Sequence, residues 1–214
     1  MTLVFRPYRH TDYPALVSIV KDTWRYDEMA SPKIAKLLAE VFVSSCLCNA
    51  THSIVAQVDG EVAGVILLKD IARHRCSVSD RWRQVSALTR LLLRREGRKI
   101  MGIFRNVSCV DARLLDEIDT QYRGEIALFV LDGRYRGCGI GKALYERALA
   151  SLRARELMPF YLFTDTSCNY RFYERQGLRR RAQHEETVRV GAREQAMAFF
   201  VYEGGDSVGD AAAA

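Results

Sequence analysis

The fold of this chain is indicated by the stretch Phe129-Val130-Leu131-Asp132-Gly133-Arg134-Tyr135-Arg136-Gly137-Cys138-Gly139-Ile140-Gly141-Lys142. It joins an apolar run that ends at Leu131 to an amphipathic run that begins at Ile140, and glycines stand at positions 137, 139 and 141. Glycine allows backbone N–H groups to face a ligand, and the N-terminus of a helix carries partial positive charge. The stretch therefore predicts a strand, a turn suited to a phosphate or pyrophosphate, and a helix. A plain strand-to-helix turn is the alternative.

Both flanks of the turn have the periodicity of regular structure. In the run 125–131, one face has Ile126, Leu128 and Val130, and the other has Ala127, Phe129 and Leu131. An apolar series on both faces predicts a central strand that is covered on both sides. After the turn, one face of a helix that must end before Pro159 has Ile140, Leu144, Ala148 and Leu152.

The rest of the chain adds strands and helices around this unit. We expect a strand at 3–7, a helix that begins after Thr11 or Asp12, and a second helix from Ser31-Pro32 to about Cys46. Two β-branched runs, 53–58 and 61–69, flank Asp59-Gly60, which suits a tight hairpin turn. Downstream we expect a strand at 160–164, a short helix at 170–175, and two strands near 178–188 and 194–202. This order indicates a single mixed α/β domain over 1–204 and a frayed tail over 205–214.

Residues 73–122 interrupt this order with an arginine-rich segment. Against a single acid, Glu96, the stretch 81–105 has the basic residues Arg81, Arg83, Arg90, Arg94, Arg95, Arg98, Lys99 and Arg105. Apolar residues recur here at helical spacing, so we expect a helical insertion with a solvated arginine face opposite a stripe of Trp82, Val85 and Leu92. Binding of nucleic acid or of an acidic substrate is the alternative, and the insertion could also cover an acceptor site.

The composition is that of an ordinary globular protein. Of the 214 residues, 49% are hydrophobic and 27% are charged, and the net charge is +6. No apolar run is long enough for a membrane span and the start lacks the features of a signal peptide, so we expect a cytoplasmic protein that has no membrane as a partner. The six cysteines, at 46, 48, 76, 109, 138 and 168, form neither a zinc spacing nor a disulfide framework. We therefore expect free, reduced thiols and no metal.

Three phosphate-binding patterns can be compared with the glycine turn. A Walker loop would require glycine in place of Arg136 and a hydroxyl residue in place of Ala143. A dinucleotide fingerprint would require glycine in place of Lys142, and it normally opens a domain. The third pattern fits, because Arg136-x-x-Gly139-x-Gly141 after an apolar strand resembles the acetyl-CoA signature of the GNAT family of N-acetyltransferases, Arg/Gln-x-x-Gly-x-Gly/Ala.

A second match to this family lies downstream. The stretch 164–178, Thr-Asp-Thr-Ser-Cys-Asn-Tyr-Arg-Phe-Tyr-Glu-Arg-Gln-Gly-Leu, resembles the family's fifth strand and its Phe-Tyr-Glu-x-x-Gly-Phe helix. Leu178 replaces the phenylalanine, and Gly133 stands where proline is common. The resemblance implies a mixed, mostly antiparallel central sheet that is flanked by helices and splayed between its fourth and fifth strands, with the helical insertion before the fourth strand.

The resemblance also implies site residues. Backbone amides would bind the CoA pyrophosphate at Arg136, Gly137, Cys138, Gly139, Ile140, Gly141 and Lys142. The backbone at Phe129 and Leu131 would pair with the pantetheine arm, and Asn169 would contact the cofactor. Tyr173 would be the general acid and Glu125 the general base. A core tyrosine, a turn-forming asparagine and a solvated glutamate remain the alternatives, and His52, His74 or His184 could replace Glu125.

The implied reaction is transfer of an acetyl group from acetyl-CoA, the cosubstrate, to the primary amine of an unidentified acceptor by direct attack in a ternary complex. The acceptor would be a small-molecule amine or a peptide amine; nucleic acid is not expected, and a homodimer is one state left open. A protein lysine or N-terminal acetyltransferase and a non-catalytic acetyl-CoA sensor are the alternatives. The sequence does not separate them.

Overall fold

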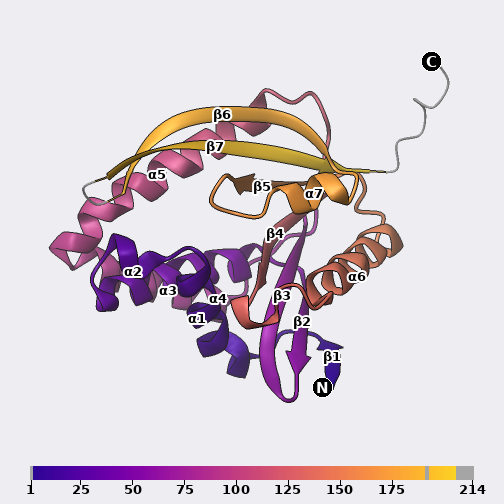
Figure 1. Cartoon of the computed structure of the whole chain (residues 1–214), viewed down its shortest axis with the longest axis horizontal. Helices are drawn as coiled ribbons and strands as arrows, with labels where there is room; N and C mark the ends of the chain where they lie inside the picture. Colours follow the sequence, from indigo (N-terminus) through magenta and orange to yellow (C-terminus); the bar gives the residue numbers. More distant parts are fainter. Residues whose placement is uncertain (1, 191–192, 206–214) are drawn as a thin grey trace.

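The structure is a computed structural model that describes residues 2–190 and 193–205. It describes the side chains of these residues except those at 103–106 and 188–195. One mixed sheet of seven strands runs through it in the order β1-β2-β3-β4-β5-β7-β6 (Figure 1). Its strands are β1 (Leu3–Arg6), β2 (His52–Val58), β3 (Glu61–Asp70), β4 (Gly124–Leu131), β5 (Phe160–Asp165), β6 (Arg179–Val190) and β7 (Arg193–Gly204). Only β4 and β5 pair in parallel among these strands. The mixed sheet is as predicted, while the tail expected beyond Gly205 lies outside the described residues.

Helices cover both faces of the sheet. One face has α1 (Tyr13–Thr23), α2 (Tyr26–Met29) and α3 (Pro32–Asn49), and the other has α6 (Ile140–Ala154) (Figure 1). Two single turns, η1 (His10–Asp12) and η2 (Gly133–Tyr135), and the short helix α7 (Arg171–Arg175) complete this part. The hairpin turn is also confirmed, because Asp59 and Gly60 both have positive φ.

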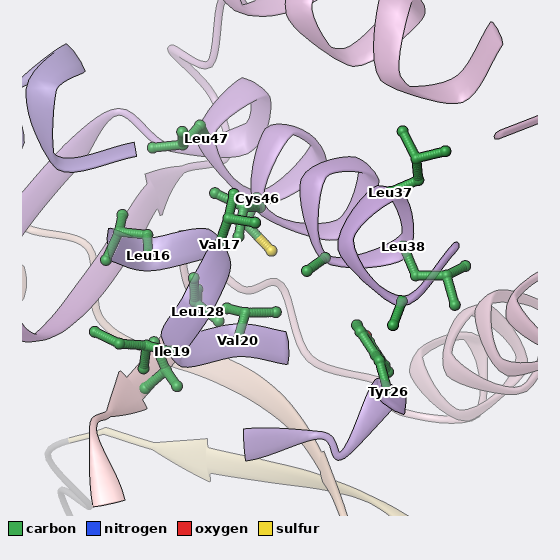
Figure 2. Close-up of a cluster of buried hydrophobic side chains, with 14 of the residues drawn as sticks. Leu16, Val17, Ile19, Val20, Tyr26, Leu37, Leu38, Cys46, Leu47 and Leu128 are labelled. Atoms are coloured by element: carbon green, nitrogen blue, oxygen red, sulfur yellow. The ribbon is translucent and has the colours of Figure 1, made fainter. Parts of the chain in front are cut away.

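The α1 to α3 face holds a core built from these helices and the central strands. Figure 2 shows Val17 and Val20 of α1, Leu38 and Cys46 of α3, and Leu128 of β4 packed together. All five side chains are buried. Because each element contributes its apolar side to one cluster, the helices fix the position of β4 from this face.

A β-bulge corrects the predicted faces of β4. Leu67 of β3 lies opposite Leu128, but Leu68 lies opposite Ile126, so Ala127 is an extra residue. The bulge reverses the alternation. Ile126 therefore joins the core beside α6 together with Phe129 and Leu131, whereas Leu128 and Val130 face α1 and α3. Sequence alternation had placed Ile126 with Leu128 and Val130, which is wrong.

The predicted helical insertion is present as two helices, α4 (Val78–Leu92) and α5 (Arg95–Asp116). Its buried side differs from the prediction. Trp82 is 70% exposed and Leu92 is 42% exposed, while Leu91 is fully buried. A Cβ added at Gly97 would lie 2.2 Å from the Leu91 carbonyl oxygen, so α5 begins in close contact with the end of α4. The predicted stripe of Trp82, Val85 and Leu92 lies on the solvent side.

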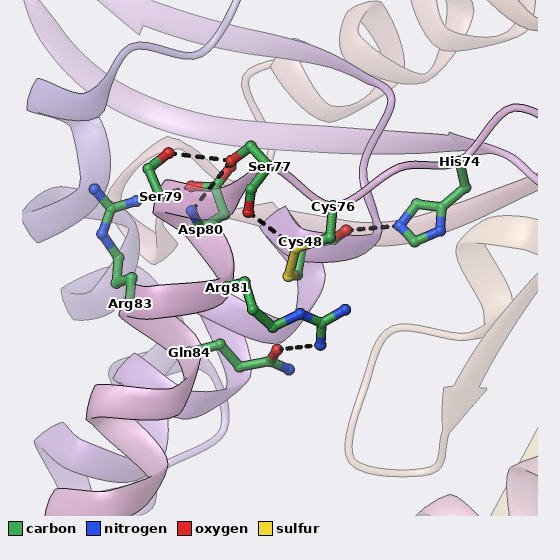
Figure 3. The surroundings of a disulfide bond; sticks show 9 residues. All are labelled: Cys48, His74, Cys76, Ser77, Ser79, Asp80, Arg81, Arg83 and Gln84. Carbon is green, nitrogen blue, oxygen red and sulfur yellow. Dashed lines mark hydrogen bonds and ion pairs between the residues drawn. A yellow bond between two sulfur atoms is a disulfide. The ribbon is translucent and has the colours of Figure 1, made fainter.

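A disulfide bond corrects the expectation of free thiols. Cys48 at the end of α3 is bonded to Cys76, which precedes α4, with a Cα–Cα distance of 4.8 Å (Figure 3). His74 Nε2 lies 2.7 Å from the carbonyl oxygen of Cys48 and holds the same connection. Isolated cysteines 28 residues apart give no signal in the sequence, because the fold alone brings them together.

No helix in residues 2–190 and 193–205 is long and apolar enough to cross a membrane.

Candidate active site

The parallel strands β4 and β5 separate after a short contact. Their pairing covers only Gly124 with Phe160 and Glu125 with Tyr161. Beyond Glu125, β4 continues to pair with β3 as far as Leu131, whereas the described residues provide no strand on its β5 side. The predicted splay is therefore present, and it leaves the edge of β4 at Leu128–Leu131 free to pair with an extended ligand.

The glycine turn follows this open edge directly. Gly137 and Gly139 have φ angles of +79° and +77°, a conformation that strains residues with a Cβ. Gly139 is the N-cap of α6, and no side chain caps the helix. The first turn of α6 contains no acidic residue. Its first N–H groups therefore remain available to an anion.

Contacts between the turn and β4 hold the two in a fixed relation. A Cβ on Gly141 would lie 3.8 Å from Leu131 Cδ2 and 3.9 Å from Phe129 Cζ, so the start of α6 rests against these side chains. At the other end of the turn, Asp132 Oδ1 accepts a hydrogen bond of 2.9 Å from the backbone N–H of Arg134. Arg136 and Lys142 are both exposed beside the glycines. Of the predicted pyrophosphate residues, Ile140 is buried, whereas those at 136–139 and 142 are exposed next to the end of β4.

Tyr173 lies on the α6 side of the sheet, within an aromatic cluster. Its ring centroid is 6.4 Å from that of Phe129 and 5.9 Å from that of Tyr202. Burial, with smaller contributions from Cys168 and Tyr145, raises the pKa of the Tyr173 phenol above its ordinary value. Its hydroxyl group makes no hydrogen bond to any described residue. The phenol is therefore protonated at neutral pH and free to donate.

Asn169 and Cys138 have more peripheral places. The carbonyl oxygen of Asn169 accepts a hydrogen bond of 3.0 Å from the N–H of Phe172, and its side chain is exposed just before α7. Cys138 is exposed within the turn, and its thiol contacts the carbonyl oxygen of Arg136 at 3.7 Å. Cys138 could thus contact a ligand through its backbone, and Asn169 could contact the edge of the ligand.

Glu125 lies where β4 and β5 part. Its Oε2 atom accepts a hydrogen bond of 3.1 Å from the Tyr161 hydroxyl group and lies 3.3 Å from Lys69 Nζ. Within the described part of the chain, Oε1 has no partner. The carboxylate is held from one side and has its second oxygen free.

Two further acids, Asp111 of α5 and Asp165 at the end of β5, act electrostatically with Glu125. Burial, with smaller contributions from the charges of Asp165 and Glu125, raises the pKa of Asp111 to about 7. The core beside α5 contains Val110, its neighbour in sequence, together with Tyr161 and Tyr122. In the described part of the chain, no group of three or more acids, histidines or cysteines is arranged to hold a metal ion.

The sequence prediction gave no role to Asp111, Asp165 or Tyr161, because their relation to Glu125 arises from tertiary contacts. The histidines considered as bases lie elsewhere. His74 is at the disulfide, His184 is on β6 opposite Phe199, and His52 opens β2. Burial, with the nearby charge of Arg155, lowers the pKa of His52.

The side chains gather at two sides of the opening between β4 and β5. The glycine turn, Phe129 and Tyr173 lie on the α6 side. Glu125 is hydrogen-bonded to Tyr161, whose core includes residues of α5.

Comparison with known proteins agrees with this geometry. The family model described as the acetyltransferase (GNAT) family matches residues 13–178. No curated protein matches the chain.

Solved structures match over nearly the whole chain. The smu.2055 protein of Streptococcus mutans UA159 has a TM-score of 0.56 at 12% identity and covers 94% of this chain and 98% of its own. Ribosomal-protein-alanine N-acetyltransferase from Brucella melitensis has a TM-score of 0.53 at 13% identity, over 92% of this chain and 98% of its own. An N-acetyltransferase from Staphylococcus aureus Mu50 has a TM-score of 0.53 at 12% identity, over 94% and 98%. At these identities the likeness is one of fold.

Proposed function

The chain belongs to the acetyltransferase (GNAT) family, and from this premise we propose that it transfers the acetyl group of acetyl-CoA to the primary amine of a small cationic acceptor, by direct attack within a ternary complex. The family supports acyl transfer in general; the acceptor and the direct attack are our proposal. The single observation that carries it is the uncapped N-terminus of α6 beside the open edge of β4.

The chain's own groups fit the donor substrate. Acetyl-CoA supplies an acyl group activated as a thioester. The N–H groups of the turn between Arg136 and Lys142 would bind its pyrophosphate, where Gly137 and Gly139 adopt positive φ and have no Cβ atoms to block the ligand. The backbone at Phe129 and Leu131 would pair with its extended arm, and Asn169 would contact it from the edge. A backbone N–H near the acyl oxygen would stabilise the negative charge that develops there.

Two side chains have the properties that proton transfer requires. An amine with an ordinary pKa of about 10 is protonated at neutral pH and must lose a proton before it attacks. Glu125 would accept that proton on Oε1, directly or through water, while Tyr161 and Lys69 hold the carboxylate in place. The new C–N bond then forms, the C–S bond breaks, and Tyr173 would donate its phenolic proton to the departing thiolate.

The surroundings of Glu125 favour a small cation as the acceptor. Asp165 adds negative potential to that of Glu125, Asp111 adds to it above its raised pKa of about 7, and Tyr161 and Tyr122 add aromatic surface. Such surroundings attract ammonium groups through charge and through cation–π contact. A peptide amine would have to reach the same acids through its terminal or lysine nitrogen.

The test is a CoA-release assay with acetyl-CoA against matched acceptors. We expect turnover with small amines, higher kcat/KM for diamines than for monoamines of equal length, and lower kcat/KM for peptides with a free N-terminus or a lysine. Acetyl-CoA should raise the melting temperature. Preference for peptides would favour the protein acetyltransferase, and a thermal shift without turnover on any amine would favour the sensor. Absence of a thermal shift would contradict the donor itself.

A further inference from the structure

Helix α4 has an apolar face that nothing in the described chain covers. Exposed large hydrophobic side chains number seven in the described part, and five of them belong to α4 or to the residue that follows it. They are Val78, Trp82, Val85, Leu92 and Leu93, and we call them the α4 apolar face. Val78, Trp82 and Leu93 are exposed by 75%, 70% and 74%, so these side chains stand out from the surface. Concentration on one helix distinguishes this face from the scattered apolar residues of an ordinary surface.

The spacing of these residues is that of one side of a helix. Val78, Trp82, Val85 and Leu92 follow each other at four, three and seven residues, which brings them onto one line along α4. The opposite side of α4 is occupied, since Ala87 and Leu91 are fully buried. The helix thus has apolar residues on two opposite sides. Only the side with Ala87 and Leu91 packs against the core, and the other side is exposed.

A basic hollow opens at the C-terminal end of the same helix. It has a volume of about 580 Å³ and is lined by Lys33, Lys36, Leu37, Glu40, Arg90, Leu93 and Arg94, which we call the basic hollow. Arg90 is paired with Glu40 at 2.8 Å. Lys33, Lys36 and Arg94 have no acidic partner within 4.0 Å in the described part of the chain. The hollow therefore has three uncompensated positive charges.

The apolar face and the hollow are continuous. Leu93 belongs to both, and the exposed cations Arg95, Arg98 and Lys99 follow it at the start of α5. At the other end, Arg81 precedes Trp82, and its guanidinium group donates a hydrogen bond to the neutral side chain of Gln84 (Figure 3). Apolar side chains that protrude between arginines and lysines are typical of helices that lie in the interface of an anionic membrane.

From this juxtaposition we infer that α4 docks the protein on the surface of an anionic phospholipid bilayer. Trp82, Leu93 and Val78 enter the boundary between headgroups and acyl chains, and the basic hollow receives a lipid phosphate. This site is separate from the glycine turn and does not depend on the acceptor of the acetyl group.

Charge favours a membrane over a second copy of the chain. In a two-fold dimer through α4, both copies would bring their basic surface into the same contact, so positive charge from each copy would be concentrated there. A free phosphate would fill the hollow and leave the apolar face in water. An anionic bilayer satisfies both features at once, because its phosphates lie directly above its acyl chains.

The first experiment follows Trp82 itself. The chain has two tryptophans, and Trp24 packs against Phe42. In the variant Trp24→Phe, Trp82 is the only tryptophan. Vesicles of phosphatidylcholine with a minor fraction of phosphatidylglycerol should shift its emission to shorter wavelength and co-sediment the protein. Vesicles of phosphatidylcholine alone should do neither, and the intact protein should co-sediment in the same way.

Variants separate the two parts of the surface. Trp82→Asp together with Leu93→Asp should abolish co-sedimentation, and Ile71→Asp, at another exposed apolar position, should not change it.

Removal of two charges by Lys33→Ala with Lys36→Ala should weaken binding roughly 25-fold, since each basic residue near an anionic surface contributes a factor of about five. The matched control is Arg155→Ala with Arg179→Ala, two exposed arginines outside the hollow. Unchanged shifts of the melting temperature by acetyl-CoA verify that each variant is folded.

Several outcomes would overturn the inference. They are no binding to the anionic vesicles, co-sedimentation without a change in Trp82 emission, and equally tight binding of free glycerol phosphate in place of vesicles. Tighter binding to duplex DNA than to vesicles at equal salt would assign the surface to nucleic acid. A dimer that Trp82→Asp converts to a monomer would assign it to a second copy of the chain.

Discussion

The glycine turn and the inserted helices α4 and α5 differ in what determines their residues. In the turn, Gly137 and Gly139 are required by their own backbone angles, because positive φ strains any residue with a Cβ. In α4, Leu91 is fully buried and its neighbour Leu92 is 42% exposed, although the two residues are chemically identical. A local conformation depends on the residue at that position, whereas the buried side of a helix depends on what packs against it.

The largest effect is expected at a residue inferred from the second motif. Tyr173→Phe removes the proton for the departing thiolate, so turnover should fall by a factor of about 100 to 10,000. Binding of acetyl-CoA should remain within about twofold, since the ring and its aromatic neighbours are kept. The control is Tyr170→Phe, three residues earlier, whose ring packs on Phe200. CoA release and calorimetric titration measure the two quantities, and full turnover in Tyr173→Phe would remove the residue from the mechanism.

The contrast within α4 is tested by two substitutions at adjacent positions. Leu91→Ala leaves a cavity between α3, α4 and α5, and should lower the free energy of unfolding by about 2–5 kcal/mol. Leu92→Ala should change it by less than about 0.5 kcal/mol. Urea unfolding of both variants measures the difference. Equal effects would mean that the two sides of α4 are equally buried in solution.

Asp111 tests whether the insertion contributes to the acceptor side. The pKa of Asp111 is raised from 3.8 to about 7 by burial and by Asp165 and Glu125, so the folded chain binds this proton more tightly than the unfolded chain. The stabilising effect of the proton is therefore lost as the pH rises from about 4 to above about 7.

Asp111→Asn should accordingly leave stability near pH 4 unchanged and raise it at pH 8, by at most about 4 kcal/mol. Thermal unfolding across this range is the measurement, and Asp116→Asn, an exposed acid in the last turn of α5, is the control. Parallel pH profiles for Asp111→Asn and the unmodified chain would place Asp111 in water, away from Glu125.

The smallest effect is expected in the glycine turn. Gly139→Ala requires a Cβ at a φ of +77°, which costs about 1–2 kcal/mol and should weaken acetyl-CoA binding by a factor of about 5 to 30. Gly133→Ala is the matched control, since Gly133 has no positive φ and nothing lies within 4 Å of the added Cβ. If neither substitution changed the affinity for acetyl-CoA, the positive φ of Gly139 would not be what requires a glycine in the turn.

The same differences explain which features of the fold and of the candidate site could be predicted from the sequence. The strands, the hairpin at Asp59-Gly60, the insertion and the splayed sheet could be predicted, because periodicity, turn residues and two local motifs carry them. The same motifs predicted the turn that holds the glycines and the short helix that holds Tyr173. The bulge at Ala127, the bond between Cys48 and Cys76, and the acids around Glu125 could not be predicted, since each arises from segments that meet only in the folded chain.

The extra residue in β4 has a consequence for how such a chain can change its length. Ala127 shifts the phase of everything between it and the glycine turn, so Phe129 and Leu131 face α6 only because the bulge precedes them. Deletion of one residue there would exchange the two sides of the strand as far as Leu131, while every side chain type stayed the same. Along this strand the number of residues is therefore a stricter requirement than their identity, and single-residue deletions should be tolerated far less than substitutions at the same positions.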